Sequence, residues 1–185
     1  MSKKAVLISI QPIWCEKIAS GEKVVEVRKT RPKLETPFKC YIYETKGFLR
    51  VGNENLNSVV GGSGRGKVVG EFVCDAVYSI DAEHVPALKD AFHGISCNEF
   101  LRKSCLSAYD LLNYLTASEQ QISIEYRPGY GWHISDLVIY DQPKQLSEFK
   151  RHDPSYDFAS FGEVDRACTV TRPPQSWCYV EEMEE

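Results

Sequence analysis

The sequence predicts an α+β protein, a small mixed β-barrel of about five to six strands with helices in the connections. Short strand-like segments recur from the first residues to residue 181, and helical patterns gather between residues 97 and 116. A strand and a helix alternate regularly only once, at the start of the chain. A doubly wound parallel sheet needs that alternation throughout, so we favour the mixed barrel.

Apolar runs and alternating patterns give the individual elements. Strands are expected at 5–10, 23–30, 38–45, 67–80, 133–140 and 176–181. Helices are expected at 12–20, at 97–105 with Ser96 as N-cap, and at 108–116 with Ser107 as N-cap, with a weaker one at 84–93. Residues 46–66 form a glycine-rich loop in this interpretation, and Gly129 to Trp132 an aromatic turn.

Composition and charge describe an ordinary globular chain of 185 residues with a net charge of −4. No apolar run approaches the ~20 residues that span a bilayer, so we expect a cytoplasmic protein without a membrane partner. Seven cysteines lack metal-ligand or CxxC spacing, so we expect reduced thiols, no metal site and no cofactor. Residues 17–67 hold eleven Lys and Arg against five acidic residues, which predicts either a local phosphate-contact surface or a solvated face.

The segment Gly21 to Arg28 (GEKVVEVR) is the most informative of the chain. Gly21 is expected to end the first helix, because the residue just past a helix often needs a positive φ. Side chains alternate along the strand that follows, so Glu26 and Arg28 share one face while Val25 and Val27 share the other. Together with Lys23, this places three charged groups on an apolar support, as in a small polar binding site.

These residues resemble a known family. The segment from Ile8 to Pro12, followed by Ile18 to Lys29, is similar to the opening of an ASCH domain, a PUA-like β-barrel, and the motif GxKxxExR is met at Gly21, Lys23, Glu26 and Arg28. Weaker similarity lies at 41–45, 66–72 and 132–137. The resemblance implies an ASCH domain over residues 1–150, with residues 151–185 as a C-terminal extension packed on or near it.

The resemblance also implies a function. PUA-like domains commonly bind RNA or modified nucleobases, here through a cleft with Lys23, Glu26 and Arg28 on its polar wall. The matched segments supply Gln11, Trp132 and Ser135 as further ligand-binding candidates, and Trp14 and Tyr130 are additional aromatic rings on which a base could stack. Arginine suits phosphates and base edges, and a carboxylate beside it can hold the guanidinium in place.

Other functions stay open at this stage. Some small ASCH proteins are amidohydrolases acting on acetylcytidine, so an alternative is an amidohydrolase or ribonuclease with Lys23 and Glu26 as catalytic residues. Glu26 stands where those enzymes have a threonine. Lys23 and Glu26 could instead form a structural ion pair, and the domain could serve only protein interaction. The sequence leaves the oligomeric state open.

Overall fold

The computed structural model describes residues 3–47, 50–51, 58–59, 64–81, 84, 91–116, 126–152 and 168–183. The chain divides into two compact units. Unit 1 comprises Met1–Ala19, Phe38–Phe72 and Asp136–Glu185, and unit 2 comprises Ser20–Pro37 and Val73–Ser135. The predicted weak helix at 84–93 lies mostly outside the described residues; of it, Phe92–His93 form the short strand β8. The loop at 46–66 is described only in part.

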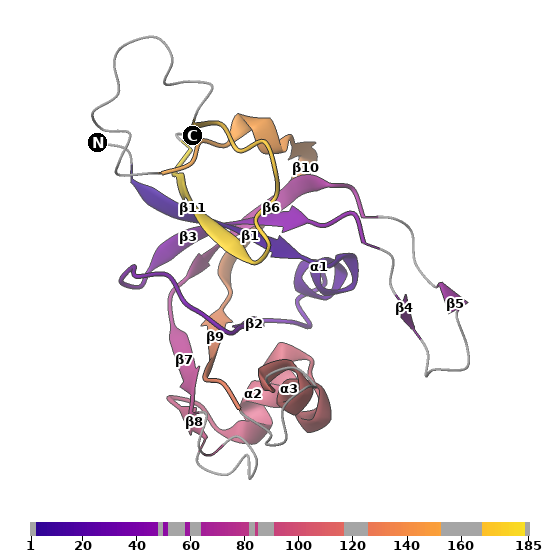
Figure 1. Ribbon diagram of the computed structural model, residues 1–185, viewed down its shortest axis with the longest axis vertical. Coiled ribbons are helices and arrows are strands. Elements are labelled where there is room, and N and C mark those ends of the chain that lie inside the picture. The colour runs from indigo at the N-terminus through magenta and orange to yellow at the C-terminus, as the bar shows by residue number, and fades with distance from the viewer. Residues whose placement is uncertain are drawn as a thin grey trace. The chain divides into compact units, whose positions relative to one another are not determined.

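Unit 1 is built on a five-stranded sheet with the order β10-β6-β3-β1-β11 (Figure 1). The strands are β1 (Lys4–Ile10), β3 (Phe38–Glu44), β6 (Lys67–Cys74), β10 (Ser135–Lys144) and β11 (Trp177–Glu181). The last two residues of β6 and the first residue of β10 belong to unit 2. β1 pairs in parallel with β3 and antiparallel with β11. Helix α1 (Pro12–Ala19) follows β1, the 3₁₀ turn η2 spans Leu146–Glu148, and β4 (Arg50–Val51) pairs with β5 (Ser58–Val59).

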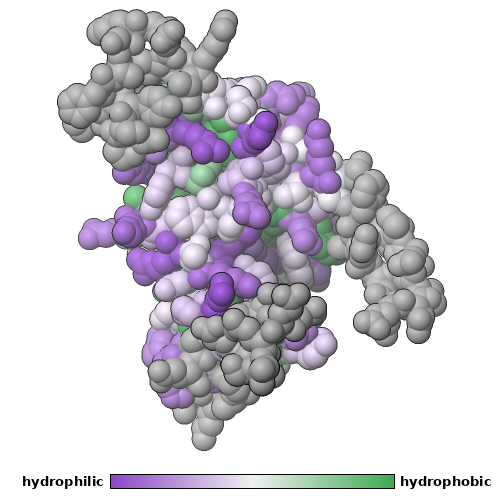
Figure 2. All heavy atoms as spheres, viewed as in Figure 1, coloured by the Kyte–Doolittle hydropathy of each residue, from purple (hydrophilic) through white to green (hydrophobic). Residues whose placement is uncertain are grey.

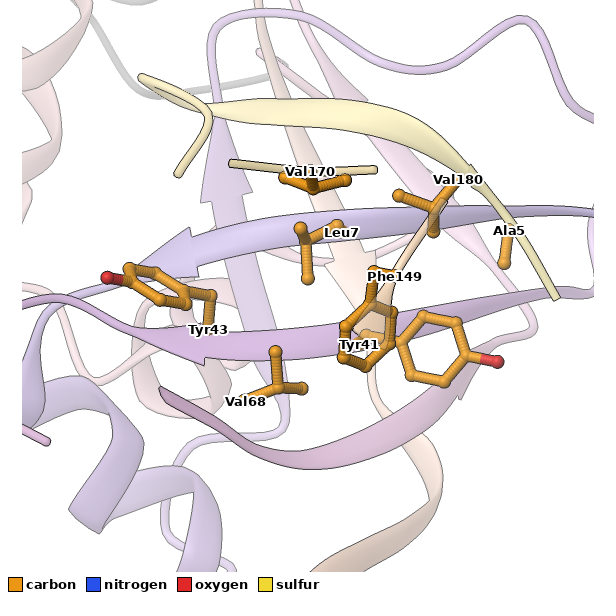
Figure 3. Close-up of a cluster of buried hydrophobic side chains, with 8 residues drawn as sticks. All are labelled: Ala5, Leu7, Tyr41, Tyr43, Val68, Phe149, Val170 and Val180. Atoms are coloured by element: carbon orange, nitrogen blue, oxygen red, sulfur yellow. The ribbon is translucent and has the colours of Figure 1, made fainter. Parts of the chain in front are cut away.

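The core of unit 1 explains why β1 is apolar at nearly every position. Ala5 and Leu7 face one cluster, while Val6, Ile8 and Ile10 are equally buried on the other side. A central strand covered on both faces shows this continuous pattern rather than alternation. Figure 3 shows the first cluster, whose members come from several separate stretches of chain: Ala5, Leu7, Tyr41, Tyr43, Val68, Phe149, Val170 and Val180.

Unit 2 is built on a four-stranded sheet with the order β2-β9-β7-β8, accompanied by two helices (Figure 1). The elements are β2 (Val25–Arg28), β7 (Val77–Ile80), β8 (Phe92–His93), β9 (Gly129–His133), α2 (Cys97–Ser104) and α3 (Ala108–Leu115). Phe100 of α2 and Leu111 and Leu115 of α3 share a buried cluster with Val25, Val27 and Ile80. The helices therefore cover the face of β2 that carries its two valines.

The predicted single barrel is not what the described residues form. Their strands divide into the sheets of five and four, besides the β4–β5 pair, and they are more numerous than the five to six expected. The strand predicted at 67–80 breaks at Asp75 and Ala76, so β6 and β7 enter different sheets. One alternation of side chains therefore does not run from residue 67 to residue 80, because a break between two strands resets it.

The Gly129–Trp132 segment was predicted as a turn and is instead most of strand β9. A Cβ atom at Gly131 would lie 2.4 Å from Cε2 of Phe100 and 2.9 Å from Cγ1 of Val25. A Cβ at Gly129 would lie 2.8 Å from Cδ2 of Leu115. These glycines therefore serve the close packing of the helices on the strand and not a reversal of the chain.

Replacing Gly131 with alanine is expected to destabilise the protein by about 1–3 kcal/mol, because the new methyl group overlaps Phe100 and Val25 in a packed core. Urea unfolding measures the change. Gly47→Ala is the matched control, since its nearest neighbour would be Oγ1 of Thr45 at 3.5 Å, an ordinary contact. Equal stability of the two variants would contradict this packing account.

A polar cluster lies in unit 1 around Glu71 of β6. The Tyr140 hydroxyl donates a short hydrogen bond to Oε2 of Glu71, and Nζ of Lys39 lies 3.0 Å from Oε1. Burial alone would raise the pKa of Glu71, but the hydrogen bonds from Tyr140 and Lys39 hold it below its ordinary value. The charged form of Glu71 is thus favoured by folding.

Because its pKa is lower in the folded protein, Glu71 stabilises the fold above its ordinary pKa, and this contribution is lost as the pH falls through the lowered value. Tyr140→Phe is expected to cost about 1.5–3 kcal/mol at neutral pH, since it removes a hydrogen bond to a carboxylate. The difference from wild type should shrink in acid, where Glu71 is protonated. Urea titrations at several pH values test this, and a pH-independent difference would contradict it.

Among the described residues, no helix is long and apolar enough to cross a membrane. On the face shown in Figure 2, hydrophilic side chains dominate the surface drawn in colour. All seven cysteines are free thiols. Burial raises the pKa of Cys74 to about 12, so this thiol stays protonated at neutral pH.

Candidate functional site: a buried Lys-Glu-Arg cluster

The predicted trio Lys23, Glu26 and Arg28 does converge, and it does so within unit 2. The carboxylate of Glu26 lies between two cations: its Oε2 is 3.3 Å from Nζ of Lys23, and its Oε1 is 2.9 Å from Nη2 of Arg28. The three residues are buried, with exposed fractions of 2% for Lys23, 6% for Glu26 and 9% for Arg28. Two cations sharing one carboxylate leave the trio with one net positive charge.

Local structure explains how this trio is formed. Gly21 has a φ of +77°, as predicted from its position after α1, and the chain then reaches β2. The backbone amide of Val24 donates to the carbonyl of Lys103, and the amide of Ile134 donates to the carbonyl of Val24. Alternation along β2 puts Glu26 and Arg28 on the face opposite the valines that pack against Phe100.

Lys23 ties this face to the end of helix α2. Its ammonium donates to the carbonyl of Ser104, the last residue of the helix, at 2.8 Å, and to the carbonyl of Val25 at 2.9 Å. The last carbonyls of a helix lack intrahelical partners and favour a positive charge. With Glu26 as a third acceptor, each of the three ammonium hydrogens has a partner. Lys23 therefore anchors Glu26 and caps α2.

The cross-strand neighbours on β9 complete the polar face. In the register of the β2–β9 pair, Glu26 lies opposite Trp132 and Arg28 lies opposite Tyr130. Residues opposite each other on antiparallel strands point to the same face. Trp132 is fully buried, so its ring has no exposed face for a base, whereas Tyr130 is half-buried. Of these two predicted stacking residues, Tyr130 is the accessible one.

The other predicted residues have different surroundings. Ser135 donates its hydroxyl to the carbonyl of Val73 at 2.9 Å, and both residues belong to unit 2. Gln11 belongs to unit 1, where it is exposed and its carbonyl accepts from the amides of Trp14 and Cys15 at the start of α1. Trp14 is half-buried on that helix. Ligand binding by Gln11 and Ser135 stays a prediction.

Sequence reasoning missed two residues beside Arg28. Lys29 is exposed, and its ammonium lies 5.1 Å from the centre of the Tyr114 ring on α3. Tyr114 is itself 39% exposed. No local pattern links α3 to β2, so only the folded chain brings this ring to the cluster.

Asp75 is a third residue that the sequence did not indicate, and it pairs with His133. The Nδ1 atom of His133 lies 2.6 Å from Oδ1 of Asp75, which follows β6 directly. His133 and Ser135 are two residues apart, but the Ser135 hydroxyl donates to the carbonyl of Val73, whereas His133 pairs with Asp75. A Ser–His hydrolytic pair therefore has no support in this geometry.

Comparison with known proteins places the fold in a class. No family model matches the chain, and no curated protein sequence matches it. Solved structures of an ASCH protein resemble it, so the chain has an ASCH domain fold, as its opening residues predicted.

The particular structures come from Zymomonas mobilis. The crystal structure of its ASCH protein has a TM-score of 0.55 and 18% identity over 96% of this chain and 88% of that one. A tyrosine-to-phenylalanine mutant of the same protein has a TM-score of 0.54 and 17% identity, over 97% and 92% of the two chains. At this level of identity the likeness is one of fold.

Proposed function

We propose that this protein binds RNA or a modified nucleotide through Arg28 and the basic tract that follows it, which we define as Lys29, Arg31 and Lys33. The observation that carries the proposal is an arginine held in one orientation next to exposed cations: Oε1 of Glu26 lies 2.9 Å from Nη2 of Arg28, and the exposed basic tract follows Arg28 directly. A phosphate or the edge of a base suits the planar donor group of an arginine that is already oriented.

The basic tract supports an anionic polymer as the ligand. Its three members are exposed, and they follow Arg28 within five residues of sequence. Exposed cations contribute attraction at longer range and salt-sensitive phosphate contacts. The buried trio then supplies the fixed contact, and the exposed tract supplies contacts along the backbone of the ligand.

The hydrolase alternative has less support than binding. A catalytic lysine acts through the lone pair of a neutral amine, whereas the Lys23 ammonium has its hydrogens directed at two carbonyls and a carboxylate. We therefore assign Lys23 and Glu26 to positioning Arg28. The free cysteines suit a reducing compartment, and we propose the cytoplasm as the location.

The test is fluorescence anisotropy with a labelled single-stranded RNA, titrated with purified protein at several salt concentrations. We expect binding that weakens as salt rises. Replacing Lys29, Arg31 and Lys33 together with glutamine should reduce the slope of log affinity against log salt by about one for each phosphate that the variant no longer neutralises. The absence of salt-sensitive binding to RNA or nucleotides at low ionic strength would contradict the proposal.

A further inference from the structure

Tyr114 presents an aromatic ring beside the proposed RNA site. It comes from α3, it is 39% exposed, and the Lys29 ammonium lies 5.1 Å from the ring centre. Burial raises the pKa of Tyr114, the charge of Arg28 lowers it and that of Glu26 raises it, and its hydroxyl hydrogen-bonds the backbone of Lys29. The ring therefore lies close enough to Arg28 and Glu26 for their charges to act on it.

The ring is also held in place. Its hydroxyl is tied to the backbone just after β2, and its helix begins with a complete capping box between Ser107 and Asp110. Leu111 and Leu115 of the same helix are fully buried in the core of unit 2. A rigid, half-exposed aromatic ring loses little conformational freedom when a flat ligand binds, which is what a stacking surface requires.

We infer that Tyr114 is a stacking site for an unpaired nucleobase, with Arg28 and Lys29 contacting the phosphates next to that base. The inference rests on the proposed function and narrows it to single-stranded RNA or a nucleotide. In a duplex the faces of the bases are covered by their neighbours, so a duplex offers phosphates to Arg28 but no free base to Tyr114. Lys29 moves off the ring when the base arrives, since an exposed cation–π contact is weak.

The experiment compares three variants of the full chain. Tyr114→Leu removes the ring, Tyr114→Phe keeps the ring and removes the hydroxyl, and Tyr109→Leu is the matched control. Tyr109 lies on the same helix and is 72% exposed. The probes are a labelled single-stranded oligouridine, an RNA duplex of the same length, and inorganic polyphosphate as a ligand without bases.

We expect Tyr114→Leu to weaken oligouridine binding about 5- to 100-fold, the range for losing one stacked base. Its affinity for duplex and polyphosphate should stay unchanged, and so should the salt slope, because no phosphate contact is removed. Tyr109→Leu should bind like wild type, and Tyr114→Phe, which keeps the ring, should retain most of the affinity that Tyr114→Leu loses. Tyr114→Trp gives a second readout, since a stacked base should quench the new indole fluorescence.

Two results separate the inference from the function on which it rests. Wild-type affinity of Tyr114→Leu for oligouridine, together with a loss of binding in Arg28→Ala, would overturn the stacking site and leave the RNA-binding function standing. Unquenched fluorescence of Tyr114→Trp with RNA bound would overturn it in the same way. If the wild-type protein binds none of the three probes at low salt, the proposed function fails and the stacking site fails with it.

Discussion

Arg28→Ala is expected to weaken single-stranded RNA binding about 10- to 100-fold, the largest loss from any one cation of this protein. The guanidinium is held by Glu26 at 2.9 Å, so its orientation is fixed before the ligand arrives. A charge-assisted hydrogen bond from a preoriented group contributes about 1.5–3 kcal/mol. Anisotropy titrations at several salt concentrations give both the affinity and the slope, and we expect the slope to fall by about one.

Two further variants distinguish this role from a general effect of charge. Arg102→Ala removes an exposed arginine of the same unit and should leave RNA affinity nearly unchanged. Arg28→Lys keeps the charge but cannot hold Glu26 and a phosphate with one planar group, so it should recover only part of the affinity. Equal losses of RNA affinity in Arg28→Ala and Arg102→Ala would show that Arg28 acts only through its charge and makes no specific contact.

Glu26→Leu is expected to have the largest effect on stability, about 3–5 kcal/mol less free energy of unfolding. The substitution leaves Lys23 and Arg28 buried without the carboxylate that both contact. Lys23 keeps its two carbonyl partners, so we expect the loss of Glu26 to affect Arg28 more than Lys23. Urea unfolding measures the change, and circular dichroism shows whether the variant is folded without denaturant.

Glu99→Gln is the control for the loss of a carboxylate. Glu99 pairs with Lys103 on the exposed side of α2, four residues along the same helix, and water screens such a pair. Its stability should equal that of wild type. If Glu26→Leu is as stable as Glu99→Gln, the trio is not an electrostatic unit and the positioning role of Glu26 is wrong.

Local signals in the sequence predicted most of the elements near the site. Ser96 and Ser107 cap α2 and α3 as expected, because each side chain accepts from the amide three residues on. Gly21 takes the positive φ that its place after α1 requires. These features depend on neighbouring residues alone, so the sequence displays them directly.

Features that depend on distant contacts were not predictable in the same way. β9 contains two glycines because α2 and α3 pack closely on it, and glycine pairs otherwise indicate turns. β8 and the β4–β5 pair have strands of two residues, too short for any alternation to appear. The break at Asp75 and Ala76 has no visible signal in the sequence, because apolar residues continue on both sides of it.

The same contrast holds at the site. The spacing of Lys23, Glu26 and Arg28 predicted their convergence, but their burial and the Ser104 carbonyl bound by Lys23 depend on α2, far along the chain. In the folded chain the Lys23 ammonium donates to two carbonyls and pairs with Glu26, contacts that the spacing of the motif does not show. The sequence did not indicate Tyr114, because the apolar pattern of its helix accounts only for the buried Leu111 and Leu115. The contact of its ring with Lys29 depends on how α3 and β2 fold together.

In the proposed function, Arg28 is held in place by Glu26 and contacts the bound RNA. The most direct test is an NMR titration that follows the side-chain N–H resonances of the arginines while single-stranded RNA is added, with Arg28→Ala used for assignment. We predict that the Arg28 resonance shifts in proportion to the bound fraction, while that of Arg102 stays in place. Saturable RNA binding that leaves the Arg28 resonance unmoved would show that Arg28 does not contact the RNA.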